Sequence, residues 1–275
     1  MLKRRIATAV VLLGVLLAAL ALGPLALAVV LALLIGAAAF EWLRLAGHKT
    51  AACVSGALAL ALALLVLDVL GLRPRAAALA MIGAGATAVW LALVFVLLQA
   101  ERHGVRIGRA VTTVLGVVTL SAAWVAALDL YRHGITILLS ALAIVWVADI
   151  AAYFVGRAFG RAKLAPRVSP SKTWAGAFGA VAAVVILALV AWQLWPAADL
   201  FSNRLFPRGT AAAVLLLALL VILAIVGDLF ESLLKRLAGV KDSSQLLPGH
   251  GGVLDRIDAL LPTLPAAMLL LDFGR

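Results

Sequence analysis

Residues 210–234 read TAAAVLLLALLVILAIVGDLFESLL, and the first 18 of them carry no charged side chain. About 17–25 predominantly apolar residues are enough for a helix to cross a hydrocarbon core of about 30 Å. Polar side chains then follow at Asp228, Glu231 and Ser232. With Lys235 they are spaced i, i+3, i+4 and i+7, so they share one helix face. The stretch predicts a transmembrane helix that ends in a polar, functional face.

Eight further apolar segments surround this one, at residues 6–22, 25–40, 51–70, 76–98, 110–130, 135–156, 175–195 and 254–273. The chain of 275 residues is 66% hydrophobic and 13% charged, whereas soluble domains are about 45–50% apolar and about 25% charged. We therefore expect an all-α, polytopic integral membrane bundle of about nine transmembrane helices, forming one membrane-embedded domain over 1–275. Residues 1–22 are also similar to a signal peptide, but a second apolar run follows at once and favours an uncleaved first helix.

Lysine and arginine are distributed unevenly between the two sides of this arrangement. The side that holds the N-terminus receives 17 of the 23 Lys and Arg residues, which predicts an N-in, C-out orientation with the functional side facing the cytoplasm. A bacterial inner membrane suits the compact chain. The net charge of +11 follows from this topology and from attraction to anionic headgroups. Aromatic residues are not interleaved with the basic runs, so no nucleic-acid binding is expected. The single cysteine, Cys53, excludes an intramolecular disulfide and a cysteine-based zinc site.

A polar stretch, LLPGHGGVLDRIDAL, occupies residues 246–260. Its proline and glycines interrupt regular helix and let the backbone approach a ligand, which suits a phosphate cradle. Carboxylates beside bound phosphate require a cation, and oxygen ligands of this kind suit Mg²⁺. The alternative is that Asp255 and Asp258 only cap and anchor a helix. The cationic side chains available to neutralise a polyphosphate are Lys235, Arg236, Lys241 and Arg256.

A second polar stretch, RVSPSKTW, occupies residues 167–174. Ser169, Lys172 and Thr173 suit phosphate or a lipid headgroup, although an ordinary basic loop with an aromatic anchor has the same composition. The two longest polar connections, 157–174 and 235–253, fall on the same side of the membrane in this topology. Any chemistry is therefore expected on that side.

Residues 232–258, SLLKRLAGVKDSSQLLPGHGGVLDRID, resemble the signature of the phosphatidate cytidylyltransferase (CDP-diacylglycerol synthase) family. The resemblance is densest over 145–260, where GDLFES, DIAAYFVGRAFGR and SPSKTWAG are also similar to the family, and residues 1–140 carry no recognisable motif. Ala175 and Ala151-Ala152 depart from the family pattern and put only local detail in doubt.

The resemblance implies that phosphatidate and CTP react to give CDP-diacylglycerol and pyrophosphate, for phospholipid synthesis. It also implies Mg²⁺ held by Asp228 and Asp255, a monovalent cation such as K⁺, and a homodimer. We expect the catalytic residues to be Asp228, Lys235, Arg236, Asp255 and Asp258. We expect the substrate-binding residues to be Ser169, Lys172, Thr173, Ser232, Lys241, Asp242, His250, Gly251, Gly252 and Arg256.

Two other functions suit the same residues. A CTP-dependent polyprenol or lipid kinase would use similar metal and phosphate groups, but it would release CDP. A cation-coupled transporter would use Asp149, Asp228 and Asp255 as ion ligands within the membrane. Transporters often contain inverted repeats, and none is apparent in this sequence.

Overall fold

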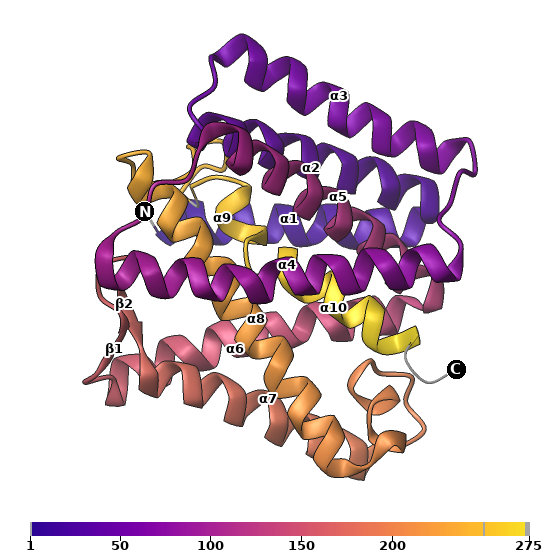
Figure 1. The fold of residues 1–275 in the computed structure, drawn as a ribbon. Helices are drawn as coiled ribbons and strands as arrows, with labels where there is room; N and C mark the ends of the chain where they lie inside the picture. The colour runs from indigo at the N-terminus through magenta and orange to yellow at the C-terminus, as the bar shows by residue number, and fades with distance from the viewer. Residues whose placement is uncertain (1, 250, 273–275) are drawn as a thin grey trace.

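The computed structural model describes residues 2–249 and 251–272, without the side chains of 2–7, 9 and 272. The chain forms a bundle of long helices (Figure 1). The helices are α1 (Leu2–Leu22), α2 (Pro24–Leu45), α3 (Thr50–Val69), α4 (Ala76–His103), α5 (Arg109–His133), α6 (Ile135–Phe159), α7 (Trp174–Leu194), α8 (Thr210–Leu237), α9 (Leu254–Ile257) and α10 (Leu260–Asp272). The first eight predicted segments each correspond to one of the helices α1 to α8.

The ninth predicted segment, 254–273, is divided into α9 and α10 rather than forming one helix. The division falls at Asp258, whose Oδ1 accepts a hydrogen bond from the backbone N–H of Ala259 at 2.8 Å. A short acidic side chain that bonds to neighbouring backbone competes with helical hydrogen bonding. The break turns the chain at the point where the polar signature ends.

Among the residues that the structure describes fully, seven helices, α2 to α8, are long and apolar enough to cross a membrane. The 13-residue α10 falls below that length. A polytopic helical membrane protein is therefore confirmed, while the number of crossings and their direction remain predictions. Successive long helices reverse direction, so their connections gather alternately at the two ends of the bundle (Figure 1).

A short β-hairpin lies at one end of the bundle, which we call the hairpin end. Strands β1 (Lys163–Ala165) and β2 (Ser169–Thr173) pair antiparallel within the connection that was predicted only as a polar loop. Glu101 of α4 holds the turn, because its carboxylate accepts the backbone N–H groups of Arg167, at 3.0 Å, and Val168, at 2.7 Å. The connections that precede α3, α5 and α9 lie at the same end (Figure 1).

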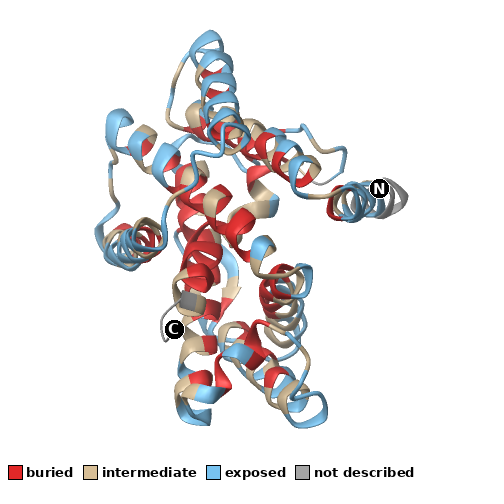
Figure 2. Ribbon diagram, turned by 90° about the vertical axis from the view of Figure 1, so that its right-hand side faces the viewer, coloured by how far each residue is buried: buried red, intermediate tan, exposed pale blue. Residues whose placement is uncertain are grey.

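The buried residues run through the middle of the bundle, and exposed residues lie mostly on the outer helices (Figure 2). Three fully buried aromatic rings fix α2 and α4 against α8. The centroid of Phe230 lies 6.1 Å from that of Trp42 and 5.8 Å from that of Trp90. Trp42 also donates from Nε1 to the carbonyl of Thr112 in α5 at 2.7 Å. The C-terminal parts of α2 and α8 are thereby held in fixed relative positions.

Replacing Gly116 of α5 with alanine is expected to destabilise the bundle. A Cβ at this position would overlap the indole ring of Trp42, and overpacking of this kind costs about 1–3 kcal/mol. We expect a lower thermal unfolding temperature in detergent. Gly85→Ala in α4 is the matched control, because no atom lies within 4 Å of its added Cβ, and it should leave Tm unchanged or raise it. An unchanged Tm in Gly116→Ala would contradict this packing.

Candidate functional site

The polar residues of the signature come together at the hairpin end, where α8 ends and α9 begins. Residues 238–253, which we call the signature loop, connect these two helices. Gly249 and Gly251 have φ values of 78° and 83°, in the left-handed region that glycine adopts without steric cost. The backbone N–H of Leu247 then donates to the carbonyl of Gly251 at 2.8 Å. This tight bend brings the chain back to α9.

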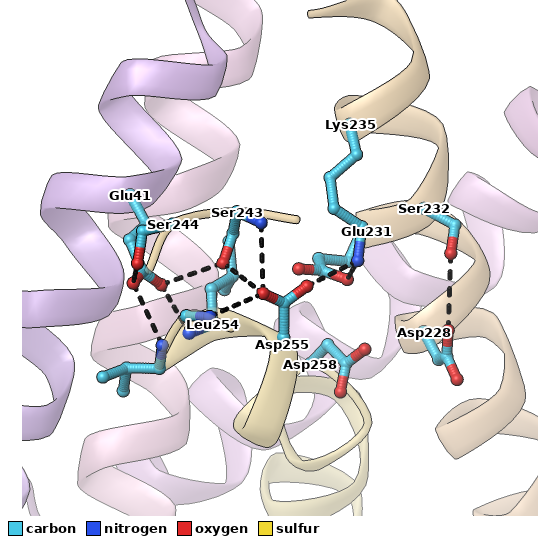
Figure 3. A network of polar contacts seen from close by, with 12 residues as sticks. Glu41, Asp228, Glu231, Ser232, Lys235, Ser243, Ser244, Leu254, Asp255 and Asp258 are labelled. Carbon is cyan, nitrogen blue, oxygen red and sulfur yellow. Dashed lines mark hydrogen bonds and ion pairs between the residues drawn. The ribbon is translucent and has the colours of Figure 1, made fainter. Parts of the chain in front are cut away.

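Asp255 lies at the centre of the site and accepts hydrogen bonds on both carboxylate oxygens (Figure 3). Its Oδ1 lies 2.6 Å from Nζ of Lys235. Its Oδ2 accepts from the hydroxyl of Ser243 at 2.7 Å, from the backbone N–H of Ser243 at 3.1 Å and from that of Gly252 at 2.8 Å. Burial acts to raise the pKa of the Asp255 carboxyl, but these donors outweigh it and hold that pKa well below its usual range.

Lys235 connects Asp255 to a second buried carboxylate. Its Nζ lies 2.5 Å from Oε2 of Glu231, which is one helical turn away on α8 and only 2% exposed. An ammonium between two carboxylates is the arrangement that allows charges to be buried together. Glu231 was predicted to share the polar face of α8 but was not assigned to the site; the structure places it directly against Lys235.

Asp228 forms a second cluster, facing the hairpin. Its Oδ2 pairs with Lys172 of β2, and its Oδ1 lies 3.5 Å from the hydroxyl of Ser232. Asp258 lies beside it, because the absent side chain of Gly227 leaves room for the Asp258 carbonyl to approach α8 (Figure 3). The structure therefore brings together Lys172, Asp228, Ser232 and Asp258, which the sequence places on three different segments.

Gly252 allows the backbone of the signature loop to pack closely against Ser243 and Glu41. A Cβ at Gly252 would overlap the hydroxyl of Ser243 and lie 2.6 Å from Oε1 of Glu41. The backbone at this position was predicted to lie along bound phosphates. In the structure its N–H faces Asp255, so the glycine also allows the signature loop to close.

Glu41, Ser243 and Ser244 belong to this network and were not predicted. Glu41 is in α2, in the region without a recognisable motif, and is 0% exposed. The apolar segment was predicted to end at residue 40, which left Glu41 in a connection. An acidic residue directly after an apolar run was the available signal, and nothing in the sequence showed which segment it would contact.

The remaining predicted residues surround the two clusters. Ser169 is buried in the hairpin, and the buried Thr173 caps α7 by accepting the backbone N–H of Gly176 at 3.1 Å. Arg236 lies near the hairpin, with Nε 3.5 Å from the carbonyl of Val168. Lys241, Asp242 and Arg256 are exposed to solvent. His250 lies outside the described residues.

Among the residues that the structure describes, no three His, Cys, Asp or Glu side chains are grouped so that they could hold a metal ion by themselves. The acidic side chains of the site offer oxygen ligands alone, which is the chemistry that Mg²⁺ prefers. Mg²⁺ commonly takes one or two protein carboxylates and completes its shell with water and substrate phosphates. The neighbouring carboxylates of Asp228 and Asp258 (Figure 3) fit that kind of site.

Comparison with known proteins identifies the family of this chain. Residues 3–273, almost the whole chain, match the Cytidylyltransferase family. This chain belongs to that family. The resemblance inferred from residues 232–258 is therefore confirmed, and the polar clusters at the hairpin end are those of a cytidylyltransferase-family protein.

Individual relatives agree with this family. A protein of Pseudomonas aeruginosa named phosphatidate cytidylyltransferase is 40% identical over 291 residues, which cover 98% of this chain and 97% of the relative. Proteins of the same name from Haemophilus influenzae and Brucella suis are 47% and 51% identical over 135 and 141 residues. These two matches cover 44% and 47% of the relatives' lengths.

Stability of this cytidylyltransferase-family chain should depend on ionised Asp255. Because the folded pKa of Asp255 is depressed, its contribution is complete above the unfolded pKa of about 3.9 and declines as the pH falls below that value. We expect Asp255→Asn to lower Tm at pH 7 by roughly 3–10 °C. The difference from the unsubstituted protein should shrink below about pH 4.

The control is Asp242→Asn, which alters an exposed carboxylate in the same loop. Exposed substitutions of this kind usually change stability by no more than about 0.5 kcal/mol, so Tm should change by no more than about 2 °C. Thermal unfolding in detergent at several pH values measures both variants. Equal Tm values for Asp255→Asn and the unsubstituted protein at pH 7 would contradict this role of Asp255.

Proposed function

We propose that this chain transfers the cytidylyl group of CTP to phosphatidate and forms CDP-diacylglycerol and pyrophosphate. The observation that carries the proposal is the meeting of Lys172, Asp228, Lys235 and Asp255 at one end of a membrane bundle. A site at a helix end can be reached by a lipid headgroup whose acyl chains stay in hydrocarbon, and by a nucleotide from water. Few sites satisfy both conditions, because a site at the midplane would exclude the nucleotide.

The reaction needs charge neutralisation more than it needs a base. The phosphate of phosphatidate is ionised at neutral pH, so one of its oxygens can attack the α-phosphorus of CTP directly. The bond from that phosphorus to the β-phosphate bridging oxygen breaks, and pyrophosphate leaves with the electron pair. Positioning and electrostatic stabilisation dominate phosphoryl transfer of this kind.

Basic residues supply much of that neutralisation. Lys172 and Lys235 each face a carboxylate inside the site, so their ammonium groups are already positioned before substrate arrives. Lys241 and Arg256 are exposed next to the site and can meet the nucleotide phosphates from solvent. Arg236 lies between α8 and the hairpin, a position suited to the phosphatidate headgroup. Ser169, Thr173, Ser232 and the Gly251–Gly252 backbone would support substrate binding.

Asp228 is the strongest candidate to hold Mg²⁺. Among the described residues, one of its oxygens pairs with Lys172 and the other lies 3.5 Å from the hydroxyl of Ser232, so lone pairs remain on both. Asp255 has three donors on Oδ2 and can contribute only Oδ1, where Lys235 now lies. Asp258 is placed to support Asp228. The metal would neutralise charge on the reacting phosphates, and the family resemblance adds a monovalent cation such as K⁺.

The membrane orientation follows from the charge distribution. Basic residues concentrate at the hairpin end, which the positive-inside rule assigns to the cytoplasm, where CTP is available. We place the chain in the bacterial inner membrane with its N-terminus inside and its C-terminus outside. Phosphatidate would reach the site sideways from the inner leaflet. A homodimer is proposed from the family resemblance.

Asp228→Asn should reduce turnover by at least about 100-fold, because it removes a charge that the metal and Lys172 both need. The assay uses purified protein in detergent with phosphatidate, CTP, Mg²⁺ and K⁺, and measures pyrophosphate and CDP-lipid together. We expect equal amounts of both products, lost on chelation. Asp199→Asn is the matched control, since Asp199 pairs with Arg204 in the connection before α8, at the opposite end of the bundle.

Two outcomes would contradict the proposed reaction, and a third would contradict the metal assignment alone. Release of CDP with a phosphorylated lipid would indicate a lipid kinase. Absence of nucleotide turnover in folded protein would favour a cation-coupled transporter. Full activity of a folded Asp228→Asn variant would show that Asp228 does not hold the metal, even if the reaction itself is as proposed.

A further inference from the structure

Glu41 connects the motif-free part of the chain to the signature loop. Its buried carboxylate accepts the backbone N–H of Val253 at 3.0 Å and that of Leu254 at 2.6 Å. It also accepts the hydroxyl of Ser244 and lies 3.2 Å from the hydroxyl of Ser243 (Figure 3). One carboxylate of α2 therefore contacts the middle of the signature loop, at Ser243 and Ser244, and the point where the loop enters α9, at Val253 and Leu254.

These contacts fix the loop to a rigid part of the bundle. Glu41 precedes Trp42, whose ring is held by Phe230 and by the carbonyl of Thr112. One turn further along α2, Arg44 donates to the carbonyl of Ser243. Because α2 cannot move freely at this point, its carboxylate gives the signature loop a defined position relative to α8.

The Ser243 hydroxyl lies between two carboxylates. Its Oγ is 3.2 Å from Oε2 of Glu41 and 2.7 Å from Oδ2 of Asp255. A hydroxyl carries one proton and can donate to one acceptor at a time. The position of Ser243 therefore depends on both carboxylates, and a change at Glu41 reaches Asp255 through a single side chain.

We infer that Glu41 is a positioning residue for cytidylyl transfer, which rests on the proposed function. It holds the signature loop closed so that Asp255 meets Lys235 and the donors of Ser243 and Gly252. Its hydrogen bonds go to the signature loop and the start of α9, so it acts through the loop. Glu41 thereby has a role in the reaction although it lies within residues 1–140, which carry no recognisable motif.

The test begins with Glu41→Gln, which keeps the side chain's size but replaces one acceptor oxygen with a donor. We expect faster hydrogen exchange at the backbone amides of Val253 and Leu254. We also expect kcat to fall by about 10–100-fold, as supporting residues of a reactive site typically show, with KM for CTP and phosphatidate changed less than about threefold.

Glu101→Gln is the matched control for exchange. Glu101, in the last turn of α4, also accepts backbone N–H groups at the hairpin end, but from Arg167 and Val168. Exchange should increase at those residues and stay unchanged at Val253 and Leu254. Asp68→Asn, which removes the ion-pair partner of Arg132 at the other end, controls for general destabilisation and should keep the original kcat below its Tm.

A double-mutant cycle tests the connection through Ser243. If Glu41 acts through this hydroxyl, Glu41→Gln combined with Ser243→Ala should reduce kcat little more than the stronger single variant. Additive losses, or unchanged exchange at Val253 and Leu254 in Glu41→Gln, would overturn the inference. If Glu41→Gln does not fold, Ser243→Ala alone must lower kcat and raise exchange at Gly252, and failure of either result also overturns it.

Failure of the proposed function gives a different result. If the unsubstituted protein shows no cytidylyl transfer, the kinetic comparison disappears, but the exchange measurement still reports whether Glu41 holds the loop. Suppose that exchange becomes faster in Glu41→Gln while the unsubstituted protein shows no turnover. Glu41 would then hold the signature loop in place, but it would have no role in cytidylyl transfer.

Discussion

The Asp255 carboxylate is the interaction on which the site depends. It joins α8 through Lys235, the signature loop through Ser243 and Gly252, and, by way of Ser243, the buried Glu41 of α2. A carboxylate removed from water must find donors or a cation, because leaving it unsatisfied costs about 1–3 kcal/mol or more. Asp255 finds both. Satisfying this one charge therefore connects the signature loop to α8 directly and to α2 through Ser243.

The location of this network at a helix end reconciles two opposing demands. A membrane bundle disfavours charge within its hydrocarbon-facing part, yet a reaction between phosphatidate and CTP needs several charges of both signs. At the hairpin end Glu41 of α2 lies on one side of the Asp255 cluster (Figure 3), and Lys172 of the hairpin pairs with Asp228. The long apolar helices hold the site in place, and their aromatic contacts, such as Trp42 with Phe230, define the separation between α2 and α8.

Two carboxylate clusters of different character result. Asp255 is fully engaged by donors and is suited to hold the loop, whereas Asp228 meets a single lysine from the hairpin and keeps free lone pairs. A carboxylate with few fixed donors, such as Asp228, can release its lysine partner and bind a metal ion in its place. It can also bind a cation that arrives with the substrate. The difference arises from surroundings and not from residue type, since both are aspartates on or next to α8.

The sequence alone determined the membrane class, the positions of the helices, the polar face that contains Asp228 and Lys235, and the family. These follow from hydropathy, helical periodicity and a local signature, which are properties of neighbouring residues. The hairpin, the division at Asp258 and the partnership of Glu41 with Ser243 were decided only by the tertiary structure. Glu41 and Ser243 are 202 positions apart, and no local pattern encodes which buried donor a carboxylate will meet. That pairing depends on how the whole bundle packs, because packing sets the distance between α2 and the signature loop.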